Sequence, residues 1–398
     1  MKQGATPCAR EADYTADVSL IPVPSPAPPK RLAGIGVGAF LLLGLLYPIL
    51  GPALPLLSEQ FGLRATGASL LLSLNSAGAV LGVILAGVLS ARLTSRNRSL
   101  LAVATLAVGC VGLAFAPTFV LALLAALLLG SGFGMLDLTL NVWLSTSYGL
   151  RSAAMLNLLS ATFGVGAVLA PLAVGFADGD FRLPLLGCAA LAGLLLLSLF
   201  ALPSAAPEVY TPTQGLQTEV RSPRLILGGF MCLFLAYVAV ESGVASWEVT
   251  HLRDTLGITT GTASQLSALF WVSFTLGRLI SAPLALRVAP AHLVTGSLVL
   301  AAFSLALATI PAVAPYAYTL TGLFLAPVFT TGLVWLTRVL PGGAAPTFVF
   351  AGAFLGPVLF SPVVGAMRDQ FGPPAIPLTL MGIALLDLAI VIGLRRNL

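Results

Sequence analysis

The chain has 398 residues, of which 58% are hydrophobic and only 8% are charged, and its formal net charge is +5. Soluble domains carry about 25% charged residues, because a water-facing surface needs them. The composition therefore excludes a soluble globular protein and predicts a membrane protein.

The hydrophobic residues occur in continuous runs, such as residues 101–116 and 121–130. Strands of a membrane barrel alternate apolar and polar residues instead, so the predicted spans are helices. Residues 1–30 contain no apolar run, which argues against a secretory signal, and their Pro-rich second half predicts a disordered cytoplasmic tail. The four cysteines show no paired spacing, so neither a disulfide nor a metal site is predicted.

Twelve segments approach or exceed the ~20 residues that a helix needs to span a bilayer. In chain order they are predicted at 33–58, 67–91, 99–116, 118–145, 152–177, 183–203, 224–250, 261–286, 292–312, 314–338, 344–367 and 373–394. The fold class is therefore an all-α membrane protein with twelve transmembrane helices.

Basic residues are unequally divided between the two ends of these segments. With the N-terminus inside, only Arg64, Arg182, Arg253 and Arg368 fall in outer loops, whereas most of the 19 Lys and Arg residues fall inside. The positive-inside rule then predicts cytoplasmic termini, in what we expect to be a bacterial inner membrane. The net charge reflects this topology and does not indicate nucleic-acid binding.

The longest polar interruption, residues 204–222, divides the membrane part into two nearly equal segments, 31–203 and 223–398. We predict an N-terminal six-helix bundle, a cytoplasmic linker and a C-terminal six-helix bundle. Equal halves favour an internal repeat. The stretches VLAPLAVGFAD (168–178) and VLFSPVVGAMRD (358–369) support one, since they place Gly175 and Gly365 in corresponding positions.

Two pseudo-symmetric six-helix halves with cytoplasmic termini and a cytoplasmic middle loop resemble the major facilitator superfamily. The resemblance implies a substrate site near the midplane between the halves. It also implies alternating access, in which the two halves rock about that site.

Three acidic residues and one basic residue fall well inside the predicted spans: Asp137, Glu241, Asp387 and Arg278. An ionised Asp in hydrocarbon costs ~2.5–3.5 kcal/mol on insertion scales, so each such group is a candidate functional residue. The alternative interpretation is a structural group that a partner neutralises.

The fourth span contains the stretch GFGMLDLTLN (132–141). Helical spacing places Gly130, Gly134, Asp137 and Asn141 on one face. Small residues alone more often indicate helix packing. The carboxylate and the amide favour a cavity on this face, and we prefer that interpretation while leaving packing open.

In the seventh span, Phe234, Tyr237, Glu241 and Glu248 share a face. Aromatic faces pack on apolar faces of ligands, and a carboxylate accepts hydrogen bonds from hydroxyl groups. We interpret Glu248 as a solvated edge residue and Trp247 as an aromatic belt residue at the outer interface.

The eighth span carries a stripe of polar and aromatic residues that ends at Arg278. The candidates for substrate binding are polar or aromatic residues that lie at similar depths in the predicted spans. For each single Trp, helix packing is the alternative interpretation. The candidates are Tyr47, Asn75, Asn141, Tyr237, Glu241, Gln265, Trp271 and Trp335.

Asp137 and Glu241 are the predicted proton-coupling residues, because burial disfavours the charged form of a carboxyl group. Asp137 is preferred, since no cation shares its stripe and Asn141 can hydrogen-bond to it. Arg278 is expected to be charge-paired. A pair with Asp137 would form a gating ion pair across the halves, and a pair with Asp387 would be structural.

Several stretches resemble the fucose permease-like branch of the superfamily. They are FLLLGLLYPILGPALPLL (40–57), GFGMLDLTLN (132–141), NLLSATFGVGAVLAP (157–171) and YVAVESGVASW (237–247). The resemblance implies sugar transport, often with protons or sodium, and places the branch's acidic and amide positions on Asp137, Asn141 and Glu241. The chain departs from the branch, since 33–58 contains no acid and Ser160 replaces a common His. It also departs from the superfamily signature after the second span, where Ala91 replaces an Asp.

The leading hypothesis is a proton-coupled symporter for a sugar or a similar small polar metabolite. An efflux antiporter of the same fold is the alternative, because GVGAVLAP (164–171) resembles an antiporter motif, and a non-transporting sensor is a third. No nucleophile–base pair, phosphate loop or metal motif occurs, so we expect no catalytic residue, cofactor or metal. The expected partners are a small-molecule substrate, a coupling proton or sodium ion, and the lipid bilayer, for a chain that acts as a monomer.

Overall fold

The computed structural model describes residues 30–148, 152–178, 180–202, 223–340, 349 and 352–398. The predicted tail (except Lys30) and linker lie outside these residues. Within them, the regular elements are helices. They are α1 (Lys30–Leu46), α2 (Leu50–Phe61), α3 (Ala65–Leu89), α4 (Ser95–Ala114), α5 (Phe119–Ser147), α6 (Ser152–Phe176), α7 (Arg182–Phe200), α8 (Pro223–Leu256), α9 (Thr260–Ala285), α10 (Pro290–Leu307), the short 3-10 helix η3 (Pro311–Val313), α11 (Ala314–Val339), α13 (Leu355–Phe371) and α14 (Ala375–Asn397).

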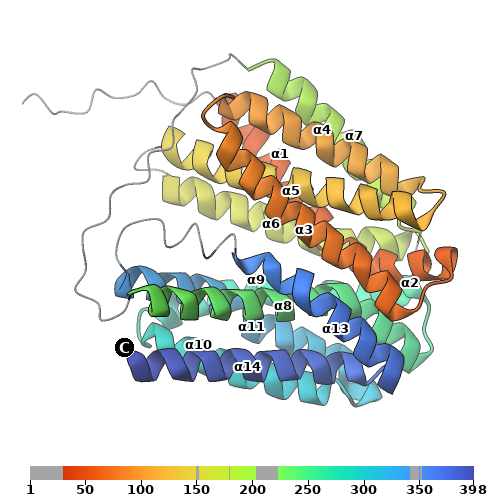
Figure 1. Ribbon diagram of the computed structural model, residues 1–398, viewed down its shortest axis with the longest axis vertical. Helices are drawn as coiled ribbons and strands as arrows, with labels where there is room; N and C mark the ends of the chain where they lie inside the picture. The colour runs from red at the N-terminus through yellow and green to blue at the C-terminus, as the bar shows by residue number, and fades with distance from the viewer. Residues whose placement is uncertain (1–29, 149–151, 179, 203–222, 341–348, 350–351) are drawn as a thin grey trace, which may run out of the picture.

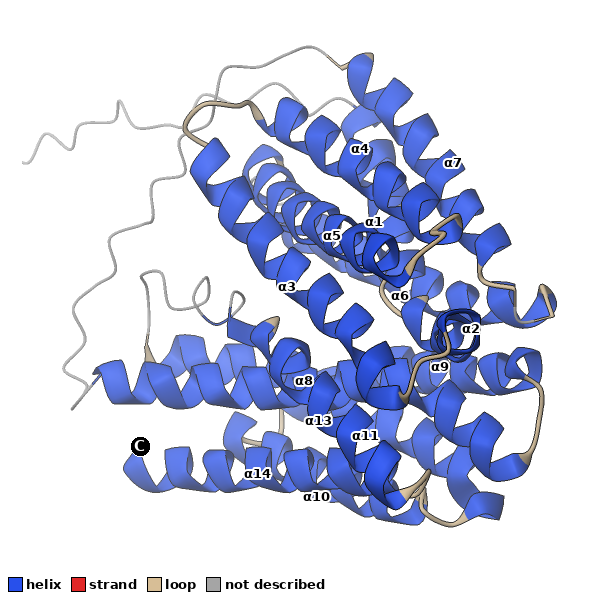
Figure 2. Cartoon of the chain, turned by 45° about the vertical axis from the view of Figure 1, so that its right-hand side comes forward, coloured by secondary structure: helices blue, strands red, loops and turns tan. Residues whose placement is uncertain are grey.

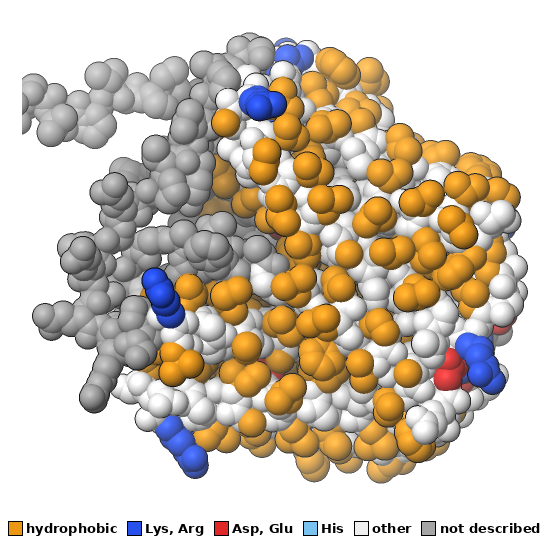
Figure 3. All heavy atoms as spheres, in the orientation of Figure 1, with side chains coloured by type: hydrophobic (Ala, Val, Ile, Leu, Met, Phe, Trp, Pro, Cys, Tyr) orange, Lys and Arg blue, Asp and Glu red, His pale blue; other side chains and the backbone are white. Residues whose placement is uncertain are grey.

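Ten of the described helices are long and apolar enough to cross a membrane, or up to 11 if the bent pair α1–α2 is one span. The eleventh predicted span, 344–367, begins outside the described residues and continues as α13. Exposed hydrophobic side chains such as Ile84, Leu197 and Phe303 cover the middle of the molecule. Figure 3 shows this apolar belt, with charged side chains mainly towards its two ends. The chain is a multi-pass, all-α membrane protein, as its composition predicts.

The helices form two groups, α1–α7 and α8–α14, which lie one above the other in Figure 1. We call the side that holds the chain ends Lys30 and Leu398 the terminal side, and the opposite side the distal side. The two groups converge on the distal side and diverge on the terminal side (Figure 2).

The first predicted span is not one straight helix. It breaks at Tyr47–Ile49, and the axes of α1 and α2 differ by 45°. Pro48 lacks a backbone N–H and its ring crowds the preceding turn, so the helix cannot continue through it. The break places Tyr47 at the bend, where its side chain faces the other group of helices.

Helix α8 extends to Leu256, almost two turns beyond the predicted end at 250. The added turns place Arg253 and Asp254 on the helix rather than in a loop. Trp247 and Glu248 are each only 1% exposed. The predictions of an aromatic belt residue and a solvated edge residue are therefore wrong, because both side chains lie inside the protein.

The glycines of the fourth span serve helix packing, which was the alternative interpretation. A Cβ atom at Gly130 or Gly134 would collide with backbone carbonyl oxygens of α3, and one at Gly78 or Gly82 would collide with those of α5. Both helices thus present two glycines four residues apart, the spacing that lets membrane helices approach closely. The close contact of α3 and α5 leaves little space for a ligand at this seam.

Candidate functional site

One described ion pair and a set of hydrogen bonds join the two groups of helices on the distal side, and a second ion pair braces one of the groups. The Arg253 guanidinium at the end of α8 donates to the Glu59 carboxylate of α2 at 2.6 Å. Asp254, the next residue on α8, accepts a hydrogen bond of 2.5 Å from Arg368 of α13. We call Glu59, Arg253, Asp254, Arg368 and the neighbouring Asp369 the distal latch.

Asp369 caps a helix of the opposite group. The N-cap residue of α3, Arg64, makes no side-chain capping hydrogen bond. Instead, the backbone N–H groups of Ala65 and Thr66 donate to the Asp369 carboxylate at 3.0 and 2.8 Å, and the Thr66 hydroxyl donates at 2.7 Å. The first N–H groups of a helix lack internal partners and carry partial positive charge, so an ionised carboxylate is favoured there.

The protonation of Asp369 follows from these contacts. Partial desolvation raises the pKa of Asp369, but the hydrogen bonds from Thr66 and Ala65 and the charge of Arg368 together hold this pKa below its ordinary value. Because the pKa is lowered in the closed structure, the ionised form stabilises distal closure at every pH above about 4, the ordinary value for Asp. The contribution is lost as the pH falls through the lowered pKa.

We expect Asp369→Asn to lower the unfolding temperature of the purified protein near pH 7, since losing a helix cap costs about 1 kcal/mol. The difference between the variant and the parent should shrink below about pH 4, where the parent carboxylate becomes protonated. Thermal unfolding across this pH range measures both effects. Thr66→Val removes only the hydroxyl donor and should cost less. An equal unfolding temperature for parent and Asp369→Asn at pH 7 would contradict the capping role.

Glycines at corresponding positions of the two halves face the opposite group of helices. A Cβ atom on Gly365 of α13 would lie 2.7 Å from the backbone oxygen of Ala65 in α3, and one on Gly175 of α6 would lie 2.9 Å from that of Gly261 in α9. These are the two glycines that the similar stretches align. The two groups of helices therefore come into close backbone contact at both glycines, and the internal repeat stays a prediction.

An aromatic layer lies at the centre, between the two groups. The Tyr47 ring, at the α1–α2 bend, lies 5.6 Å from Trp271 of α9, measured between ring centroids. It also lies 5.9 Å from Phe133 of α5, whose ring in turn lies 6.5 Å from that of Phe354 at the start of α13. Rings from both groups therefore meet at this level.

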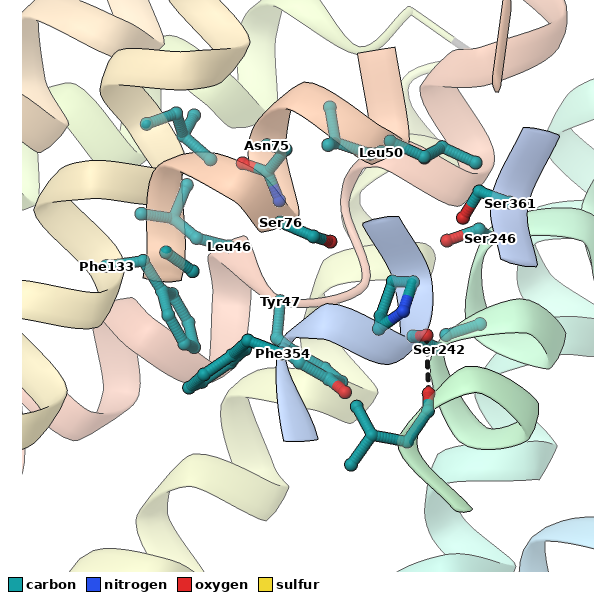
Figure 4. A pocket seen from close by; sticks show the side chains of 16 residues that line it. Leu46, Tyr47, Leu50, Asn75, Ser76, Phe133, Ser242, Ser246, Phe354 and Ser361 are labelled. Carbon is teal, nitrogen blue, oxygen red and sulfur yellow. Dashed lines mark hydrogen bonds between the residues drawn. The ribbon is translucent and has the colours of Figure 1, made fainter. Parts of the chain in front are cut away.

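A small cavity of about 50 Å³ lies next to the aromatic layer, towards the distal latch. Its polar lining is uncharged and comes from both groups: Tyr47, Asn75, Ser76, Ser242, Ser246 and Ser361. Figure 4 shows these side chains around the cavity. A water needs about 10–15 Å³ by this measure, so the cavity holds a few waters and excludes a larger solute.

A larger cavity of about 580 Å³ lies on the terminal side of the layer, between α6, α9 and α11. Its polar lining includes Asn157, Ser160, Thr275, Arg278 and Thr331. Small-molecule sites typically measure about 300–1,000 Å³. On α9, Trp271 lies one turn from Thr275, so the aromatic layer separates this cavity from the small one.

Glu241 and Arg278 lie at the edge of the aromatic layer. They interact electrostatically with each other and with Tyr47 and Tyr237, although no ion pair of Arg278 occurs in the described part of the chain. The Arg278 guanidinium instead lies 4.7 Å from the centre of the Phe274 ring. The pair thus brings opposite charges to the edge of the aromatic layer, and Arg278 also lines the larger cavity.

The sequence profile of the Major Facilitator Superfamily matches residues 36–253, more than half of the chain. The chain belongs to the major facilitator superfamily. A relative, the sodium-dependent glucose transporter 1A of Mus musculus, is 25% identical over 390 residues, which cover 86% of this chain and 90% of that protein.

Solved structures of other superfamily transporters share the fold. A D-xylose-proton symporter superposes with a TM-score of 0.72 at 15% identity, covering 90% of this chain and 97% of that chain. The transporter FucP in its outward conformation superposes with a TM-score of 0.61 at 17% identity, covering 91% and 98%. The fold of two six-helix bundles that the sequence resemblance implied is confirmed.

In this superfamily transporter, the structure brings together five of the predicted residues. Tyr47, Tyr237, Glu241, Trp271 and Arg278 gather at the aromatic layer, and Asn75 lines the small cavity beside it. Sequence periodicity placed these residues on helix faces. Only the packed structure shows that the faces point towards one another.

Asp137 lies apart from this cluster. The Asn141 amide donates to the Asp137 carboxylate and to its backbone oxygen, each at 2.9 Å, as the sequence suggested. Neither Asp137 nor Asn141 lines one of the cavities described above. Arg278 pairs with neither Asp137 nor Asp387 in the described part of the chain, so the gating ion pair stays a prediction for another conformation.

Two other candidates for substrate binding lie outside the cluster. Gln265 packs against Gly175 where α9 meets α6 on the distal side, and its side chain is exposed. Trp335 packs edge-on against Phe230, with 5.0 Å between ring centroids, which is the packing role expected of a single Trp. Neither residue lines the two central cavities.

Most of the small hydroxyl residues that line the cavities were not predicted from the sequence, including Ser242, Ser246, Ser361 and Thr331. Serine and threonine are common in membrane helices, where they bond to the preceding turn, as Ser242 does to Val238. Their spacing alone therefore did not indicate that they line a cavity. Ser160, noted only as a departure from the related branch, lines the larger cavity.

Proposed function

We propose that the chain is a secondary active transporter that moves a sugar or a similar small polar metabolite by proton-coupled symport. We place it in a bacterial inner membrane as a monomer with both termini in the cytoplasm. The observation that carries the proposal is the central cluster of Tyr47, Tyr237, Glu241, Trp271 and Arg278. It combines aromatic faces with opposite charges at the junction of the two halves.

The cluster suits a polyhydroxylated solute. Aromatic faces pack against the C–H faces of a sugar ring, and a carboxylate and a guanidinium accept and donate hydrogen bonds to its hydroxyl groups. The named relatives support this substrate class, since one is a sodium-dependent glucose transporter and one is a D-xylose-proton symporter.

Alternating access is supported by the unequal closure of the two sides. The distal latch and the aromatic layer bury the path from the distal side, whereas the cavity of about 580 Å³ lies on the terminal side. We propose that residues 31–203 and 223–398 rock as two bodies joined by the linker 204–222. The structure then corresponds to an inward-facing state.

We propose Asp137 as the proton-coupling carboxylate and Glu241 as a substrate-binding group. Arg278 interacts electrostatically with Glu241, so the two side chains form one polar site at the edge of the aromatic layer. Asp137 contacts Asn141 and, among the described residues, no cation within ion-pair distance. A carboxyl group with no cation nearby is the better site for reversible protonation.

Uptake into proteoliposomes tests the proposal. The purified chain is reconstituted, a pH gradient is imposed, and the uptake of radiolabelled D-xylose, D-glucose and fucose is measured. Accumulation that requires the outside to be acidic supports proton symport. Depletion of preloaded sugar would favour the antiporter. Accumulation that requires a sodium gradient rather than a pH gradient would show that sodium is the coupling ion. No movement of any sugar would overturn the substrate class.

A further inference from the structure

The C-terminal half contains a second buried acidic residue, distant from the central cluster. Glu248 is 1% exposed, and neither of its carboxylate oxygens has a hydrogen-bond partner within the described residues. It lies eight residues before the end of α8, which is about 12 Å from the distal end of that helix. An unpartnered carboxylate is costly in such a place unless it is neutralised.

A histidine and a tyrosine lie beside Glu248. His251, three residues along the same face of α8, is fully buried, and its Nδ1 lies 3.1 Å from the Tyr318 hydroxyl of α11. The other ring nitrogen, Nε2, has no partner in the described part of the chain. Tyr318 also interacts electrostatically with Glu248. When the Tyr318 hydroxyl donates to Nδ1, Nε2 carries the hydrogen and can donate to Glu248 after a side-chain rotation.

Charged groups around the pair come from several helices. On the elements packed against α8, the described ionisable groups on the distal side are Glu59, Arg368 and Asp369, and those deeper in the membrane are Arg278 and Asp387. Among the described residues, none of these groups interacts electrostatically with Glu248, and His251 interacts with its helix neighbour Asp254. Arg253, on the last turn of α8, points to Glu59.

We propose that Glu248, His251 and Tyr318 form a proton-binding site inside the C-terminal half, separate from the substrate cluster. One proton adds to a Glu248 oxygen, forms an O–H bond and leaves the site neutral, and its release restores the carboxylate. Any role of this site in transport rests on the proposed function, proton-coupled symport. Binding of the proton is a property of the folded protein and can be measured without substrate.

The site is connected to the distal latch. Asp254 acts electrostatically on His251 and also holds Arg368 of α13. His251 thus lies between Glu248, which takes up the proton, and Asp254, whose helix neighbour Arg253 holds Glu59 of the other group. This connection gives the site a means of linking protonation to the opening of the distal side.

Infrared difference spectroscopy of the purified full-length protein, titrated with pH, tests the proposal. A protonated carboxyl group without a hydrogen-bond partner gives a C=O stretching band that disappears on ionisation. We expect a band that titrates in the parent protein and is lost in Glu248→Gln, separate from any band of Asp387. In His251→Gln, which retains the carboxyl group, the band should remain and its midpoint should shift to a different pH.

A matched control is Asp387→Asn. Asp387 is also fully buried in the C-terminal half, and neither of its carboxylate oxygens has a hydrogen-bond partner among the described residues. In particular, no described histidine or tyrosine is hydrogen-bonded to it. The Glu248 band should persist in this variant with an unchanged midpoint. A Glu248 band that does not titrate, or one that sodium ions remove at constant pH, would overturn the proposal. If the band titrates while no gradient drives sugar uptake, the proton site stands and the proposed transport function fails.

Discussion

Replacing Gly51 with valine should hold the distal side open and reduce transport to near background. A Cβ atom at this position of α2 would collide with the backbone carbonyl oxygen of Ala245 in α8. Overpacking costs ~1–3 kcal/mol even where side chains can move, and here the obstacle is backbone. Because about 1.4 kcal/mol changes an equilibrium constant tenfold, the equilibrium constant for closing the distal side should fall by about tenfold or more.

Labelling of a cysteine at Ser246, which lines the small cavity, measures this effect. Both proteins carry Cys8→Ser and Cys232→Ser, so that the exposed Cys232 does not react with the label. A membrane-impermeant maleimide added from the distal side should react faster in the Gly51→Val variant than in the parent. Gly87→Val is the control, since nothing lies within 4 Å of a Cβ atom there. Equal labelling rates in Gly51→Val and the parent would show that this contact does not control closure.

Replacing Asp137 with asparagine should abolish uphill accumulation while leaving substrate exchange intact. Asn keeps the shape and the hydrogen bond with Asn141 but cannot titrate, so a pH gradient no longer drives net uptake. The ratio of inside to outside substrate should fall to about 1, the value for passive equilibration. Exchange of labelled for unlabelled substrate, which needs no net proton movement, should continue near the parent rate.

Glu241→Gln provides the contrast. Because Glu241 is proposed to bind substrate beside Arg278, this variant should lose both accumulation and exchange. A hydrogen bond to a charged group is worth about 1.5–3 kcal/mol, which corresponds to roughly 10–100-fold weaker binding. If Asp137→Asn still accumulates substrate against its gradient, Asp137 is not the coupling residue.

The distal latch shows how a membrane transporter uses charges at its surface rather than in its core. Surface ion pairs are individually weak, with a median of ~0–1 kcal/mol. Here they join the two groups of helices together with a helix cap and close backbone contacts. Weak, additive contacts of this kind suit a side that must open and close in every cycle, because no single one prevents opening.

Composition and periodicity were sufficient to establish the class of this protein. Few charges and long apolar runs require spanning helices, because a bilayer offers no water to satisfy backbone groups. Two equal sets of six spans predicted an internal repeat, which stays a prediction, and Gly175 and Gly365 each lie close to the backbone of the opposite group. The break at Pro48 could not be predicted from the proline alone, because Pro171 of α6 and Pro327 of α11 lie inside continuous helices.

Tertiary packing decided the functional details. Helical periodicity tells which residues share a face but not which helix lies opposite, so it could not show that Arg278 lies near Glu241 rather than Asp137. It could not show that Asp369 caps a helix of the other half, nor that Glu248 is buried beside His251 and Tyr318. Each of these arrangements depends on residues that are distant in sequence, which only the packing of the helices brings near one another.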